Sequence, residues 1–306
     1  MRVAVFLVVV IFLTGVFAAG CVSETALKNE SVQMENKSEC KTVFVNGVDL
    51  AYVIYGNGTP MILCMGYAGT MDMWSPELID RLAEDHQVIV FDYRGMGLSG
   101  PTESNYTMQI LADDTKGLMD ALNISRADVL GWSMGTYVAQ NLVLTYPDAV
   151  DHLILYAGDC GGTEYIQPAP SVESALANTS GTSEERGMRL LKLILPEEWM
   201  AKHPDIMSYF PQVTETSPAE SVEQQYLAIG EWVENGTYAS LPEISSPTLI
   251  LTGTEDILTP PENSFILGER INGSWVVQMK GGGHGVMYQY PAEMSAIIRT
   301  FIETTS

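Results

Sequence analysis

From residue 42 onward, short apolar runs alternate with stretches that have helical spacing. The apolar runs span 61–65, 88–91, 127–130, 153–156, 248–251 and 275–278. Runs without polar alternation suit strands that are buried on both faces of a parallel sheet. Helical spacing lies between them, at 76–83, 108–122, 134–144, 261–271 and 291–302. This alternation predicts an α/β fold with a mostly parallel sheet flanked by helices.

Two further strands are predicted at the start of this region, over 42–45 and 48–55. They flank the dipeptide Asn46-Gly47. Both residues tolerate a positive φ, which a two-residue hairpin turn requires. We therefore expect an antiparallel hairpin that brings the sheet to eight strands.

One long interval interrupts the alternation. Residues 161–242 separate two predicted core strands and contain a helical stretch over 184–194 together with several aromatic residues. We interpret this insertion as a helical cap over the carboxyl edge of the sheet. The core is then formed by 42–160 and 243–306.

The first 41 residues differ from the rest of the chain. Arg2 precedes an apolar run over 3–13, which is too short to span a membrane and is typical of a signal peptide over 1–20. Ala18-Ala19-Gly20-Cys21 resembles a lipobox, which implies that Cys21 becomes a lipid-bearing N-terminus. An uncleaved anchor helix is the alternative. Residues 21–41 are polar and are expected to form a tether.

Composition limits the possible partners. The chain has 306 residues, 15 Lys and Arg against 38 Asp and Glu, and 46% hydrophobic residues, so it is expected to fold. Its formal charge of −23 disfavours nucleic acid, because binding to phosphate backbones depends on basic side chains. We expect a small-molecule partner and a membrane attachment only through the N-terminus. The sequence does not indicate an oligomeric state.

Glycosylation sequons and cysteines bear on export to the cell surface. Eight of the eleven Asn residues lie in sequons, and these are Asn29, Asn36, Asn57, Asn105, Asn123, Asn178, Asn235 and Asn272. Besides Cys21, the chain has Cys40, Cys64 and Cys160, without metal-type spacing. One disulfide is possible after export, but Cys64 lies in an apolar run that predicts a buried thiol.

The strongest catalytic candidate is Ser133 in Gly131-Trp132-Ser133-Met134-Gly135. The motif directly follows a predicted strand and precedes a predicted helix. Small residues two positions before and after the serine relieve crowding in a sharp turn that exposes the hydroxyl. We therefore predict that Ser133 is a nucleophile.

A serine nucleophile needs a base, and the base is usually a histidine oriented by a carboxylate. Of the four histidines, His284 follows the last predicted strand within Gly281-Gly282-Gly283-His284-Gly285, where a flexible loop can place its imidazole over the sheet edge. Asp256 follows the strand predicted at 248–251 and is the favoured carboxylate. Asp159, after the strand at 153–156, is its rival.

Acyl transfer also requires two hydrogen-bond donors for the oxyanion of the tetrahedral intermediate. The backbone amide of Met134 is one candidate. The second is the amide of Tyr67, because Gly66-Tyr67-Ala68-Gly69 follows the strand at 61–65 and allows close approach of the backbone. These glycines could instead only close a turn.

Over about residues 42–303 the chain resembles the alpha/beta-hydrolase superfamily. The resemblance rests on the Ser133 motif, the Asp256 and His284 loops, their order along the chain, and the segment from Asp92 to Ser99, which is structural in capped members. It implies no catalytic role for Asp92 or Arg94. Met65-Gly66 stands where the family commonly has His-Gly.

The resemblance and the residues together predict a serine hydrolase that cleaves a carboxylic ester, or a related acyl bond, of a small, apolar substrate through an acyl-enzyme. No metal or cofactor is required. An acyltransferase or a carbon–carbon bond hydrolase using the same triad remains open. So does a non-catalytic ligand-binding protein at the cell surface.

Overall fold

An eight-stranded sheet forms the centre of the protein. The computed structural model describes residues 39–102, 106–178 and 180–306. The strands lie in the order β1-β2-β4-β3-β5-β6-β7-β8. Their bounds are β1 Lys41–Val45, β2 Val48–Tyr55, β3 Thr59–Cys64, β4 His86–Phe91, β5 Ala127–Trp132, β6 Val150–Tyr156, β7 Thr248–Gly253 and β8 Trp275–Met279. The pairs β1·β2 and β2·β4 are antiparallel and the others parallel, which confirms the predicted sheet.

The antiparallel edge begins with the predicted hairpin. Val45 pairs with Val48, and the two residues between them, Asn46 and Gly47, have φ values of 47° and 87°. Positive φ at both central positions defines a type I′ turn, whose twist matches that of the flanking strands. The Asn46-Gly47 dipeptide thus sets the register of the first pair.

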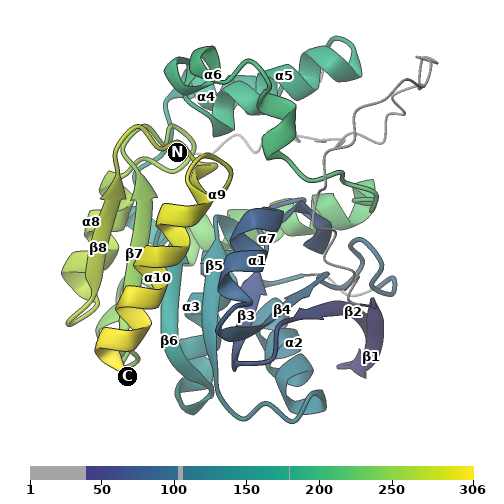
Figure 1. The fold of residues 1–306 in the computed structure, drawn as a ribbon, viewed down its shortest axis with the longest axis vertical. Coiled ribbons are helices and arrows are strands. Elements are labelled where there is room, and N and C mark those ends of the chain that lie inside the picture. The colour runs from purple at the N-terminus through teal and green to yellow at the C-terminus, as the bar shows by residue number, and fades with distance from the viewer. Residues whose placement is uncertain (1–38, 103–105, 179) are drawn as a thin grey trace, which may run out of the picture.

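The predicted helices cover both faces of the sheet (Figure 1). In this view α1 (Pro76–Leu82) and α10 (Pro291–Thr305) lie in front of the strands, and α2 (Met108–Ala121) and α3 (Met134–Thr145) lie behind them. Helix α8 (Glu262–Arg270) packs on β7 and β8. Because the central strands β5 and β7 are then buried on both faces, every one of their residues is buried.

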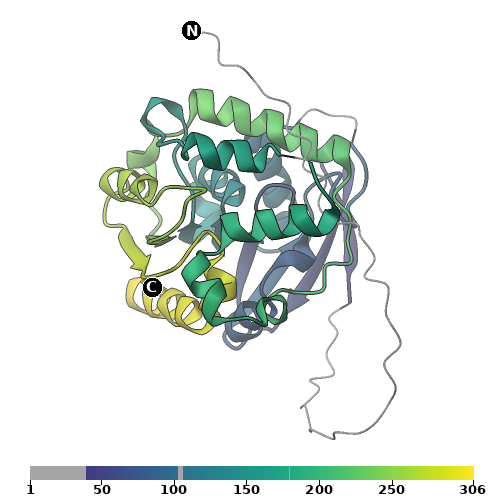
Figure 2. The ribbon, with the colours of Figure 1, turned by 90° about the horizontal axis from the view of Figure 1, so that it is seen from above.

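The β6–β7 connection, residues 157–247, contains the helices α4 to α7. Their bounds are α4 Pro170–Leu176, α5 Ser183–Ile194, α6 Glu197–Lys202 and α7 Ala219–Asn235. Figure 2, a view from above, shows these helices spread across one end of the sheet. Three short 3₁₀ turns, Gly162–Glu164, Ile206–Tyr209 and Leu241–Glu243, accompany them.

Several predictions concern residues outside the described ranges. These are the signal peptide, lipidation of Cys21, most of the tether, and the sequons at Asn29, Asn36 and Asn105. The five sequon asparagines that the structure describes are all exposed. Within the described ranges no helix is long and apolar enough to cross a membrane. Among the described residues Cys40, Cys64 and Cys160 form no disulfide, and Cys64 is buried as its apolar run predicts.

Candidate active site

Ser133 occupies a sharp turn between β5 and α3. Its backbone has φ 54° and ψ −122°, a conformation that costs energy for any residue with a side chain. Trp132 and Met134 are buried on either side, whereas Ser133 itself is partly exposed. The turn therefore presents the hydroxyl while its neighbours anchor the backbone.

The two motif glycines permit this turn because there is no space for side chains. A Cβ on Gly131 would lie 2.4 Å from the carbonyl oxygen of Gly135. A Cβ on Gly135 would lie 2.0 Å from the carbonyl oxygen of Cys64, the last residue of β3. Close approach between α3, β5 and β3 thus requires glycine at both positions.

The loop after β3, residues 65–69, lies beside Ser133. A Cβ on Gly66 would be 3.4 Å from the Cβ of Ser133, so this backbone runs directly past the nucleophile candidate. The amides of Ala68 and Gly69 donate to Gln225 Oε1 and to the carbonyl of Gly66. Met134 is the first residue of α3, where the amide has no acceptor within the helix.

His284 and Asp256 are in direct contact. His284 Nδ1 lies 2.9 Å from Asp256 Oδ2, and both side chains are buried. The other oxygen of Asp256 accepts hydrogen bonds from the amides of Leu258 and Thr259, each at 2.9 Å. These bonds fix the carboxylate, and the carboxylate in turn fixes the orientation of the imidazole.

The loops that carry the pair are in close contact, which explains how residues 28 positions apart meet. Gly253, at the end of β7, has no room for a Cβ because the carbonyl oxygen of Gly282 would lie 2.1 Å from it. The amide of Glu255 also donates to that carbonyl at 2.8 Å. The glycine-rich character of the His284 loop therefore serves backbone contact with the Asp256 loop.

His284 is tied to the Ser133 turn through Trp132. The indole Nε1 of Trp132 donates to the carbonyl of His284 at 3.1 Å, and the two rings lie 5.7 Å apart. The hydroxyl of Tyr156 donates to the same carbonyl at 2.5 Å. No hydrogen bond joins Ser133 to His284 among the described residues. Catalytic bonds of this kind are often long before substrate binds and shorten in the complex.

Asp159, the rival carboxylate, has other partners. It accepts hydrogen bonds from the hydroxyl of Tyr137 at 2.6 Å, the indole of Trp232 at 3.2 Å and the amide of Gly161 at 2.8 Å. Burial raises the pKa of Asp159, and these three donors oppose the rise. The structure thus places Asp159 between α3 and α7 and joins Asp256, not Asp159, to the imidazole.

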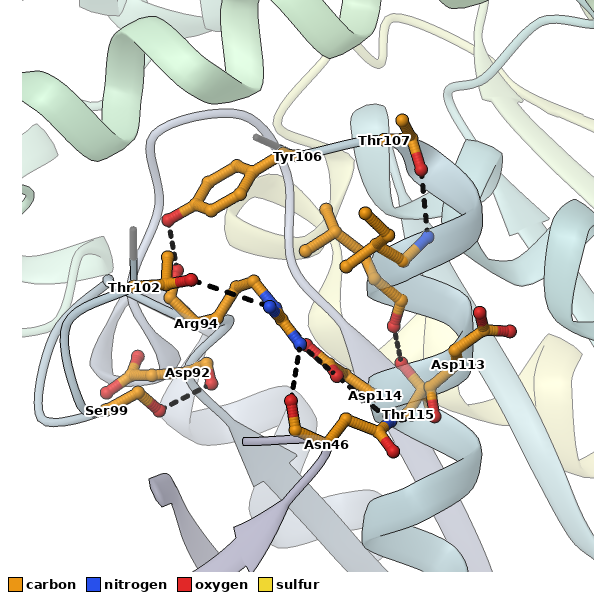
Figure 3. Close-up of polar contacts among 12 residues, drawn as sticks. Asn46, Asp92, Arg94, Ser99, Thr102, Tyr106, Thr107, Asp113, Asp114 and Thr115 are labelled. Carbon is orange, nitrogen blue, oxygen red and sulfur yellow. Dashed lines mark hydrogen bonds and ion pairs between the residues drawn. The ribbon is translucent and has the colours of Figure 1, made fainter. Parts of the chain in front are cut away.

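The segment from Asp92 to Ser99 forms structural contacts. Asp92 accepts hydrogen bonds from the amides of Met71 and Leu98 at 2.7 and 2.8 Å. Arg94 makes two bonds to Asp114, at 2.6 and 2.7 Å, and Tyr106 donates to the Arg94 carbonyl (Figure 3). Both residues therefore hold this turn against neighbouring elements.

Aromatic side chains surround the His284 loop, a feature that motif spacing alone did not reveal. Trp132 packs against Trp74, Tyr156 and Tyr288, with ring centroids 6.2 to 6.3 Å apart. Phe210 of the β6–β7 connection lies 4.3 Å from Tyr288. Trp132 lies inside the serine motif and Phe210 is one of the aromatic residues of the insertion, but the sequence did not show that these rings converge from distant segments.

Three buried polar atoms near this site have no hydrogen-bond partner among the described residues. They are the hydroxyl of Tyr67, in the loop after β3, Nε2 of Gln225, in α7, and Nε1 of Trp74, whose ring packs on Trp132. Burial raises the pKa of the Tyr67 phenol, so this group is neutral over the ordinary pH range. The described residues contain no group of His, Cys, Asp and Glu that could hold a metal ion.

Comparisons with known proteins agree with this fold. The chain is 26% identical to "Putative carbamate hydrolase RutD" of Pantoea ananatis over 79% of its own length and 88% of that protein. A thermophilic esterase from Thermogutta terrifontis is 25% identical, with a TM-score of 0.74 over 88% of this chain and 99% of that one. The enol-lactonase from Burkholderia xenovorans, at 23% identity and a TM-score of 0.72 over 86% and 100%, shares the fold.

The family match covers more than half of the chain. Residues 59–291 match the family described as alpha/beta hydrolase fold, a range that includes Ser133, Asp256 and His284. Two of the similar proteins described above are named as a carbamate hydrolase and as an esterase. The protein therefore belongs to the alpha/beta hydrolase fold family, and the names of these relatives support a hydrolytic activity.

Proposed function

We propose that the protein is a serine hydrolase that cleaves a carboxylic ester or a related acyl bond through an acyl-enzyme. Ser133 Oγ attacks the carbonyl carbon while His284 Nε2 accepts its proton, and His284 then protonates the leaving group. Water, deprotonated by His284, attacks the acyl-enzyme and releases the acid. Asp256 holds Nδ1 and stabilises the charged imidazole.

One observation carries this proposal: the strained Ser133 turn and the His284–Asp256 pair are joined by Trp132. Backbone strain at a partly exposed serine is retained where the surrounding structure over-determines it, as at catalytic turns. The buried 2.9 Å contact with Asp256 fixes Nδ1 of the His284 imidazole. Nε2 is then left to accept the proton of Ser133 when substrate is bound. A ligand-binding protein without turnover would need neither feature.

The amides of Tyr67 and Met134 are the proposed donors to the oxyanion. Met134 supplies a free amide at the start of α3, and the helix dipole adds partial positive charge there. Gly66 brings the loop after β3 alongside Ser133, so we call residues 65–69 the oxyanion loop. The proposed donor is the backbone amide of Tyr67. It does not depend on the side chain at position 65, where Met65 replaces the family's usual histidine.

The proposed substrate is small and apolar where it meets the protein. Trp74, Trp132, Tyr288 and Phe210 gather beside His284, and the β6–β7 connection, our proposed cap, contributes Phe210. Such rings favour apolar acyl or alcohol groups. Carbamates belong in the test panel, because a relative is named for them and their carbonyl presents the same electrophile.

A fluorophosphonate probe tests the nucleophile directly, because only an activated serine reacts with it. We expect the wild-type protein to be labelled at Ser133 and to hydrolyse short p-nitrophenyl esters. Ser133→Ala should abolish labelling, and Ser133→Ala or His284→Ala should lower kcat at least about 10³-fold with an unchanged melting temperature.

Contrary results would point to the alternatives. Absence of labelling in correctly folded wild-type protein would favour the ligand-binding function. Labelling without ester or carbamate turnover would favour acyl transfer to another acceptor or carbon–carbon bond cleavage. Activity retained in either alanine variant would overturn the residue assignment itself.

A further inference from the structure

The oxyanion loop is held by the β6–β7 connection at one residue. Ala68 is fully buried and has φ 56°, an uncommon conformation for a residue with a side chain. Its amide donates to Gln225 Oε1 at 2.8 Å. Its carbonyl accepts from the hydroxyl of Ser217 at 2.7 Å. Both backbone polar groups of Ala68 are therefore bonded to side chains about 150 residues away in the chain.

Gln225 lies in a position where an amide is costly. It belongs to the buried stripe of α7 with Val222, Ala228 and Trp232, and none of its surface is exposed. Its Nε2 has no partner among the described residues, so half of the amide is buried without compensation. An apolar side chain would fit this stripe better. The bond to Ala68 is what distinguishes glutamine from such a residue.

We propose that Gln225 is a positioning residue that holds the oxyanion loop in its catalytic conformation, assisted by Ser217. This inference rests on the proposed function, because it assigns the Tyr67 amide to the oxyanion. Tyr67 lies between Gly66, whose carbonyl accepts from Gly69, and Ala68, whose amide is fixed by Gln225. Fixing both neighbours restricts the direction in which the Tyr67 amide points.

Loss of the Gln225 bond has a specific physical consequence. The buried amide of Ala68 would have no acceptor, and its positive φ would lose one of two external restraints. The loop would then relax and misdirect the Tyr67 amide by a fraction of an ångström or more. Such displacement weakens binding of the oxyanion more than binding of the ground-state carbonyl.

Through this contact, helix α7 is connected to the oxyanion loop. Gln225 and Ser217 both belong to the β6–β7 connection, whereas Ala68 belongs to the core. A movement of α7 away from the sheet would release the loop together with any cover over the site.

Gln225→Met is the principal test, because methionine keeps the length and volume of the side chain but removes the acceptor. We expect kcat for a p-nitrophenyl ester to fall about 10- to 100-fold while KM changes less than about 3-fold. Affinity for a trifluoromethyl ketone, whose adduct with serine places an oxyanion in the same site, should fall by a similar factor. Gln225→Glu retains an acceptor oxygen and should restore most of kcat.

Thr237→Val is the matched control. The hydroxyl of Thr237 donates to Gln140 Oε1 at 2.7 Å, so this variant also removes a bond between the connection and the core, but one made to α3 and not to the oxyanion loop. It should lower the melting temperature without changing kcat or ketone affinity. Equal losses of kcat in Thr237→Val and Gln225→Met would overturn the proposal.

Hydrogen exchange of the full-length protein without substrate separates this proposal from the proposed function. A peptide covering 66–70 should exchange faster in Gln225→Met than in the wild-type protein. If the methionine variant fails to fold, Ser217→Ala replaces it, and the same peptide should show a smaller increase in exchange. Unchanged exchange would overturn the positioning role. If the wild-type protein never reacts with the fluorophosphonate and Gln225→Met still exchanges faster, the hydrolase function is refuted but the contact between Gln225 and Ala68 is supported.

Discussion

Two buried aspartates, Asp159 and Asp256, follow the neighbouring strands β6 and β7. The sequence placed Asp159 and Asp256 at the same edge of the sheet and favoured Asp256, but spacing alone left both within reach of His284. The structure separates them by their partners: Asp256 bonds to His284, and Asp159 bonds to Tyr137 and Trp232. These partners come from α3 and α7, whose contact no local pattern predicts.

Replacing each aspartate by asparagine should therefore have different effects. Asp256→Asn should lower kcat by about 10³- to 10⁴-fold, because an amide favours the wrong imidazole tautomer. Asp159→Asn should leave kcat within about 3-fold but reduce the free energy of unfolding by about 1–3 kcal/mol, since its buried bonds are disturbed. Steady-state kinetics and urea denaturation measure the two effects. The reverse ranking in kcat would transfer the orienting role to Asp159.

At the scale of elements, the core was predictable and the connection was not. All eight strands and six helices were expected within a few residues, because apolar runs and helical spacing depend only on which face is buried. Helices α4, α6, α7 and the four-residue α9 (Val286–Gln289) were not predicted. The buried stripe of α7 contains Gln225, and that polar residue obscures the pattern that would have revealed the helix.

Helix α2 provides a test of which charged contacts support the elements. Asp114 is buried and makes two bonds to Arg94, which follows β4, whereas Asp120 is exposed and pairs with Lys116 within the helix. Asp114→Asn should lower the free energy of unfolding by about 3–5 kcal/mol, because it leaves a buried guanidinium without a counter-charge. Asp120→Asn should cost only about 0.3–0.5 kcal/mol. Similar losses in the two variants would show that the Arg94 pair is not a structural anchor.

On the scale of the whole molecule, excess acidity affects how the connection docks on the core. Residues 214 and 215 donate their amides to Asp72, and the amide of Gly97 donates to the carbonyl of Thr216. The carboxyl groups of Glu215 and Asp92 both lie beside Gly97, where a Cβ would be 2.1 Å from Asp92 Oδ2 and 2.5 Å from Glu215 Oε2. Burial, Asp92 and Asp72 raise the pKa of Glu215 to about 9.

This pair should make stability depend on pH above the usual range of carboxyl groups. The folded state retains a proton on Glu215 that the unfolded chain loses near 4.5, so the free energy of unfolding should fall as pH rises from about 4.5 to 9. Glu215→Gln cannot ionise and should show a shallower decline. Denaturation of both proteins at pH 5, 7 and 9 measures the difference. Parallel curves would mean that Glu215 is ionised in the folded protein.

The two bonds to Ala68 limit how the molecule can be rebuilt. A chimaera in which the segment 161–242 is exchanged for that of a relative would keep Ser133, Asp256 and His284 intact. It would nevertheless lose Gln225 and Ser217, and with them the external restraints on a loop that it did not replace. To transfer specificity in this scaffold, the exchanged segment would therefore need a hydrogen-bond acceptor at position 225 and a hydrogen-bond donor at position 217.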